Sequence, residues 1–174
     1  WSTMAQAVGA ETAPRVVAET SRRMLAKRDA YVNLLRNTLA AFAGATGGAD
    51  ALTVLPFTVS LGLPDRSARR MARNTQLILK DEAGLARVVD PGGGSFYVEN
   101  LTDQLASAAW STFQELERAG GFLALLESGG LAERIGAQWA TRERALATRR
   151  EMVTGVSAFP LVDEHAVELD PFDP

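Results

Sequence analysis

The stretch Gly47–Phe57, "GGADALTVLPF", decides the fold, because a helix end and a strand follow each other there directly. Glycine accepts the left-handed backbone that ends a helix, and a helix is predicted over residues 30–44. The apolar run of residues 51–55 then predicts a short buried strand of a parallel sheet. Chemistry in such a sheet is expected where a strand ends, yet this end offers only Thr53 as a polar side chain.

The helix over residues 30–44 is predicted to follow Asp29 as its N-cap. Its apolar positions recur at helical spacing and are expected to form the face that turns to the core. These positions are Tyr31, Leu34, Leu35, Leu39 and Phe42.

The remaining elements alternate in the front half and are helical in the back half. A strand is expected over residues 16–18, a helix over 65–79 behind Asp65, two extended pieces within 87–101, and helices over 102–118 behind Thr102, over 122–127 and over 131–152. The front half therefore predicts consecutive βα units, and the class is α/β and helix-rich overall.

Composition excludes several functions. The 174 residues carry a net charge of −3 and are 47% hydrophobic, which is typical of a globular domain and gives no electrostatic reason to expect nucleic acid or a membrane surface as partner. The absence of cysteine excludes disulfides and thiolate metal sites. A cytoplasmic protein is the simplest interpretation. The first residue is Trp1, and the stretch 159–174 is acidic and linker-like, so we expect both ends to be cut from a longer chain.

No catalytic constellation is visible in the residues themselves. His165 is the only histidine and has no second or third ligand nearby in sequence, so no metal site is expected. The segment "DPGGGS" lacks the spacing of a phosphate-binding loop and predicts a tight turn. Four arginines crowd the helix behind Asp65, and they form either a solvated face or a contact with an anionic ligand or partner; they are Arg66, Arg69, Arg70 and Arg73.

Three strings carry a resemblance to a known family. They are "TSRRMLAKRDAYVNLLRNTLAAFAGATGGADALTVLPF" at 20–57, "LPDRSARRMARNTQLILKDEAGLARVVDPGGGSFYVENLTDQLASAAW" at 63–110, and "ELERAGG" at 115–121. They strongly resemble the methylmalonyl-CoA mutase family, whose enzymes use adenosylcobalamin and coenzyme A thioesters. The combination of "ARNTQ" and "DPGGGSFYVENLT" is the most specific part of the likeness.

The resemblance implies where the parts of the chain belong. Residues 1–90 match the last βα units of a (β/α)₈ TIM barrel that binds the acyl-CoA, and residues 91–160 match the helical segment that follows it. Residues 161–174 would be a linker toward a cobalamin-binding domain that is missing here.

The same resemblance implies that this chain is not catalytic. Catalytic chains of the family carry "HCQTS" and "SLHTN" at the ends of two barrel strands, and alignment puts Val17 and Thr53 at the two histidines and Leu55 at the asparagine. Valine cannot donate a hydrogen bond, and threonine cannot supply an imidazolium. The pattern is similar to the small, non-catalytic subunit of heterodimeric mutases, so a catalytic large subunit is the expected partner.

Other matching positions are retained. Arg36 aligns with an arginine near the substrate channel, and Asn74, Gln76 and Glu82 align with a segment near the adenosyl group. Adenosylcobalamin is expected in the complex but not on this chain alone, and self-association is a further possibility. Two alternatives stay open: part of a mutase for another acyl-CoA with a site remodelled around Thr53, and a stand-alone interaction module derived from the barrel.

Overall fold

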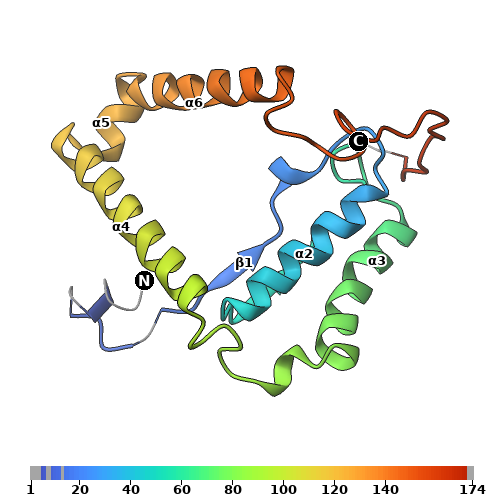
Figure 1. The fold of residues 1–174 in the computed structure, drawn as a ribbon, viewed down its shortest axis with the longest axis horizontal. Coiled ribbons are helices and arrows are strands. Elements are labelled where there is room, and N and C mark those ends of the chain that lie inside the picture. Colours follow the sequence, from blue (N-terminus) through green and yellow to red (C-terminus); the bar gives the residue numbers. More distant parts are fainter. Residues whose placement is uncertain (1–4, 7–8, 13, 172–174) are drawn as a thin grey trace. The chain divides into compact units, whose positions relative to one another are not determined.

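A computed structural model describes residues 5–6, 9–12 and 14–171 of the chain. Its elements are β1 (Val17–Glu19), η1 (Arg22–Met24), α2 (Val32–Thr46), β2 (Ala51–Thr53), α3 (Arg66–Leu77), η2 (Ile78–Glu82), η3 (Leu85–Arg87), α4 (Phe96–Arg118), α5 (Gly121–Glu127) and α6 (Gly130–Ala147) (Figure 1). The class is α/β and helix-rich, as predicted. A closed barrel is not formed by the described residues, whose sheet has two strands.

The chain divides into two compact units, each of which we describe by itself. Unit 1 consists of residues 1–91 and 160–174, and unit 2 consists of residues 92–159. The last three residues of the predicted linker, 172–174, lie outside the described residues.

Unit 1 contains a β–α–β motif. Strands β1 and β2 pair in parallel, with α2 as the connection between them. The helix lies close to one face of the sheet at Gly44, where a Cβ atom would stand 3.2 Å from Leu52 Cδ1 and 3.8 Å from Ala18 Cβ. Glycine at this position therefore permits the close approach, and the predicted order of a strand, a helix and a parallel strand is confirmed.

The predicted inward face of α2 is wrong for most of its members. Leu35 and Leu39 are 66% and 69% exposed, whereas the buried residues of the helix are Asn33, Asn37 and Ala41. Backbone carbonyls of the loop after β2 need hydrogen-bond donors, and the two amides meet that need from the inward face. Satisfying buried backbone groups therefore outweighed apolar periodicity in this helix.

The start of α2 also differs from the prediction. Asp29 does not cap the helix with its side chain; it has a φ of 47° and offers its carbonyl oxygen to the N–H of Val32. The N-cap residue is Tyr31, whose side chain makes no capping hydrogen bond. The first turn of α2 contains no acidic residue.

Helices α2 and α3 pack through small side chains. Two apolar clusters fill unit 1, one of Ala41, Val54, Ala72 and Leu79, and one of Ala30, Phe57 and Ala68. Alanines at the contact allow the two helix backbones to approach closely. Helix α3 begins behind Asp65, whose Oδ1 accepts a hydrogen bond from Ala68 N at 2.7 Å, so the predicted N-cap is confirmed.

Unit 2 begins with a helix where extended chain was predicted. Helix α4 begins at Phe96, and Ser95 Oγ accepts from Val98 N while Glu99 Oε1 accepts from Gly94 N at 2.8 Å. These two acceptors satisfy N–H groups at the helix start and outweigh the strand preference of the aromatic and β-branched residues behind them. Thr102 lies inside the helix and is not its cap.

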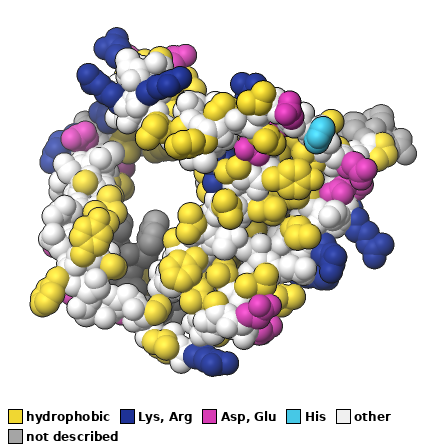
Figure 2. All heavy atoms as spheres, turned by 45° about the vertical axis from the view of Figure 1, so that its right-hand side comes forward, with side chains coloured by type: hydrophobic (Ala, Val, Ile, Leu, Met, Phe, Trp, Pro, Cys, Tyr) yellow, Lys and Arg dark blue, Asp and Glu magenta, His cyan; other side chains and the backbone are white. Residues whose placement is uncertain are grey.

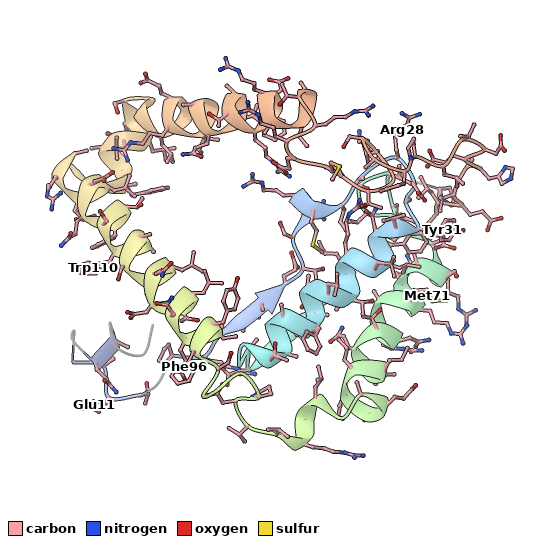
Figure 3. All side chains as sticks on the ribbon, viewed as in Figure 1. Glu11, Arg28, Tyr31, Met71, Phe96 and Trp110 are labelled. Atoms are coloured by element: carbon pink, nitrogen blue, oxygen red, sulfur yellow. The ribbon has the colours of Figure 1, made fainter. Side chains whose placement is uncertain are left out.

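The three helices of unit 2 bury little. No residue of α4, α5 or α6 is buried. Trp110 lies on α4 (Figure 3), and its ring stacks with the ring of Phe113 on the same helix, with the centroids 5.3 Å apart. Helix α6 ends at Ala147 and not near residue 152. Arg149 there has a φ of 55°, which a continuing helix does not allow.

Candidate functional site at the ends of β1 and β2

Val17 and Thr53 lie on the same face of the two-stranded sheet. In the register Val17 pairs with Ala51, and Glu19 pairs with Thr53. Paired residues share a face and successive residues alternate, so all four side chains project to the face that α2 does not cover. Val17 is 67% exposed there, and Thr53 is exposed as well.

The chemistry of this open face is limited. Valine has no polar atom, and a threonine hydroxyl by itself is neither a general acid nor an activated nucleophile near neutral pH. Glu19 is the one ionisable side chain among the four, and it is exposed. None of the four side chains on this face is an imidazole, and His165 belongs to the segment 160–171.

The polar groups beside the strand ends are tied to the backbone. Thr20 is 3% exposed, and its Oγ1 accepts a hydrogen bond from Leu55 N at 2.9 Å. Asn37, 2% exposed, donates from Nδ2 to Leu55 O at 2.7 Å. Both backbone groups of Leu55 are thus held by side chains, which fixes the chain just after β2.

Asn33 braces the loops after both strands. Its Nδ2 donates to Ala26 O and to Phe57 O, each at 2.9 Å, and its Oδ1 accepts from Ala26 N at 3.0 Å. Ala26 lies in the loop after β1 and Phe57 in the loop after β2, so one buried amide joins the two. These contacts stabilise the strand ends and leave the amide no spare donor for a ligand.

Arg36 is joined to the same brace. It is half-buried on α2, and its Nη1 donates to Asn33 Oδ1 at 2.8 Å. The guanidinium therefore supports the amide that holds the loops. Its predicted role in substrate binding stays a prediction.

The predicted cofactor residues are not brought together. Asn74 and Gln76 are half-buried on α3, and Glu82 is exposed at the end of η2. Residues two apart on a helix project about 160° from each other, so Asn74 and Gln76 cannot both face one ligand. Their contact with adenosylcobalamin stays a prediction.

Histidine and metal chemistry find no support in the described residues. His165 lies on the surface beside acidic side chains (Figure 2). Within residues 5–6, 9–12 and 14–171, no group of three or more acidic or histidine side chains could hold a metal ion. None of the helices in these ranges combines the length and apolarity that a bilayer crossing requires.

Sequence reasoning missed the residues that organise this site: Thr20, Asn33 and Asn37. The available signal was the spacing of Asn33 and Asn37, which lie four positions apart and therefore on one side of a helix. Asparagine is a poor helix former, so two at this spacing inside a helix indicate a polar task on that side. The apolar residues on the opposite side of the helix also recur at helical spacing, and that periodicity predicts them as the inward face.

Fold and site together define an α/β chain whose strand ends carry no imidazole and whose buried polar side chains hold backbone groups. The sequence model of the family described as methylmalonyl-CoA mutase matches residues 1–174, and the chain belongs to this family.

Three relatives show what the chain is similar to. The methylmalonyl-CoA mutase small subunit of Streptomyces virginiae is 55% identical over 98% of this chain and 28% of its own length. The small subunit of Propionibacterium freudenreichii subsp. shermanii is 44% identical over 88% of this chain and 24% of its own. A methylmalonyl-CoA mutase of Rhizobium meliloti is 37% identical over 89% and 22%. The chain thus spans between a fifth and a third of each relative's length.

Proposed function

We propose that this chain is part of the small, non-catalytic subunit of a methylmalonyl-CoA mutase, and that it supports the fold of a catalytic large subunit. The observation that carries the proposal is the open face of the sheet, where Val17 and Thr53 supply no imidazole. The polar side chains beside that face, Thr20, Asn33 and Asn37, hold backbone groups. The side chains that stabilise the fold are thus different from those that would carry out the reaction, and we propose that this chain retains only the former.

We also propose that β1, α2, β2 and α3 are consecutive units of a (β/α)₈ barrel. The parallel register supports this, because a parallel pair of three-residue strands is too small to be stable without further strands. Three exposed apolar side chains lie on the side of α2 that faces away from the sheet, and we propose that further protein covers them in the full-length complex; they are Leu35, Leu39 and Phe42.

The reaction proposed for the whole complex is the interconversion of methylmalonyl-CoA and succinyl-CoA in the cytoplasm. Adenosylcobalamin supplies the radical chemistry when it is bound to the complex, and the protein supplies positioning and shielding. We place no cofactor on this chain, because Asn74, Gln76 and Glu82 do not face one point. The relatives named small subunits support a large-subunit partner.

Co-expression tests this assignment. The full-length protein carrying this sequence is produced with and without a methylmalonyl-CoA mutase large subunit, and both preparations are run on a sizing column and assayed with adenosylcobalamin and methylmalonyl-CoA. We expect a co-eluting complex that forms succinyl-CoA, and no turnover by the small chain alone. Separate elution of the two chains, or turnover without the large subunit, would refute the assignment.

A further inference from the structure

Residues 160–171, which we call the strap, lie against the starts of α2 and α3. The sequence predicts this stretch as an acidic linker, and it contains no lysine or arginine. In the structure the strap belongs to unit 1 together with both helices. It passes the end of α2 where the labelled Arg28 and Tyr31 lie (Figure 3).

Two apolar side chains anchor the strap. Val167 packs against the buried cluster of Ala30, Phe57 and Ala68. Leu169 forms an isolated antiparallel bridge with Pro64, and its Cδ1 lies 3.2 Å from where a Cβ atom on Gly62 would stand. The glycine therefore leaves room for the leucine, and the surface under the strap is shaped to receive it.

Glu164 attaches the strap near the start of α2. Its Oε1 accepts a hydrogen bond from Asp29 N at 2.6 Å. Helix α2 has neither an acidic residue in its first turn nor a side-chain cap. A carboxylate near the positive end of a helix dipole is favourable, so the strap supplies the charge that the helix itself lacks.

Asp170 attaches the strap to the start of α3. Its Oδ2 lies 2.9 Å from Arg69 Nη1, and its N–H donates to Leu63 O at 3.1 Å. The same Arg69 nitrogen donates to Pro64 O, so the guanidinium joins the strap to the residue that precedes the N-cap of α3. One ion pair and one backbone bridge, to which the hydrogen bond from Asp170 N to Leu63 O belongs, thus hold the end of the strap.

The strap packs on the cluster that contains a residue held by the strand-end brace. Val167 packs against the cluster of Ala30, Phe57 and Ala68, and Phe57 O accepts the hydrogen bond from Asn33 Nδ2 at 2.9 Å. The ring of Tyr31, at the start of α2, lies 5.1 Å from the ring of Phe57. Docking of the strap and the position of the loop after β2 therefore share one cluster.

We propose that residues 160–171 are a strap that locks the loop after β2 in place, held by the Val167 anchor and by the carboxylates of Glu164 and Asp170. Release of the strap exposes the cluster around Phe57 and loosens that loop. This inference is independent of whether the chain is catalytic.

Hydrogen exchange of the full-length protein tests the strap with two matched variants. Val167→Asp puts a charge into the anchor, whereas Val162→Asp changes a valine of the same segment that is 91% exposed. We expect Val167→Asp to speed amide exchange in residues 163–171 and 56–62 by about tenfold or more, and Val162→Asp to leave both segments unchanged. Equal exchange in the two variants, or strap exchange in the unaltered protein as fast as in a free peptide, would overturn the proposal.

A charge swap tests the strap in the case that Val167→Asp prevents folding. The swap changes only half-exposed and exposed side chains, so the fold should tolerate it. Asp170→Arg should speed exchange of residues 167–171, and the double variant Arg69→Asp with Asp170→Arg should restore the slow rate. Asp163→Arg, which alters a carboxylate of the strap outside this pair, is the control and should change nothing. Unchanged exchange in Asp170→Arg, or a double variant as fast as the single one, counts against the strap.

Discussion

At the scale of single residues, the site contains two buried threonines with opposite roles. Thr20 Oγ1 accepts the hydrogen bond of Leu55 N, whereas Thr58 Oγ1 is buried without a partner among the described residues. Thr58 is 0% exposed and Thr20 is 3% exposed, so burial does not distinguish them. The difference lies in the hydrogen bond alone.

We therefore predict that Thr20→Val destabilises the full-length protein and Thr58→Val does not. The first change leaves Leu55 N–H buried and unpaired, which costs about 1–3 kcal/mol of unfolding free energy. The second replaces an unsatisfied hydroxyl by a methyl group and should be neutral or slightly stabilising. Urea denaturation measures both, and equal losses in the two variants would contradict the assigned contacts.

At the scale of elements, α3 shows what the sequence could predict. Its aspartate cap was readable because Asp65 stands directly before a helix-forming run, and its carboxylate does accept from Ala68 N. The strand order and the short helix α5 were readable for similar local reasons. The inward face of α2 was not readable, because it depends on carbonyls of Leu55 and Phe57 that lie more than fifteen residues away.

The cap of α3 gives a prediction of its own. Asp65→Ala should lower the unfolding free energy by about 0.5–2 kcal/mol, since it leaves Ala68 N–H without its acceptor. Asp65→Asn keeps an acceptor oxygen and should retain most of the stability. Thermal unfolding monitored by circular dichroism checks the pair; a loss in Asp65→Asn as large as in Asp65→Ala would show that charge and not capping is responsible.

In the candidate site, too, some features could be predicted from the sequence and others could not. The lack of an imidazole at the strand ends could be predicted from the sequence, because Val17 and Thr53 carry none in any fold. The brace formed by Thr20, Asn33 and Asn37 was not readable, since its partners are backbone groups brought close only by the parallel register. The docking of the strap could not be predicted either, because the stretch is acidic and its apolar residues show no periodicity.

At the scale of the whole molecule, the side of α2 that faces away from the sheet exposes apolar side chains, and we expect further protein to cover it. Leu39 is 69% exposed in this chain. If further protein covers this side of α2 in the full-length protein, Leu39→Glu should lower its melting temperature by several degrees, about 1 kcal/mol or more. Ser67→Glu, at an exposed position of α3, is the control and should change stability by about 0.5 kcal/mol or less. Equal melting temperatures in the two variants would show that the outer side of α2 faces solvent.

The central claim is that this chain keeps the scaffold of a mutase and contributes no catalytic side chain. The direct measurement is kcat/KM for methylmalonyl-CoA of the assembled complex whose small subunit carries Val17→Ala together with Thr53→Ala. Because neither side chain supplies an acid, a base or a charge, we expect kcat/KM within about twofold of the unaltered complex. A fall of about a hundredfold, with assembly and melting temperature unchanged, would show that Val17 or Thr53 takes part in the chemistry and would contradict the claim.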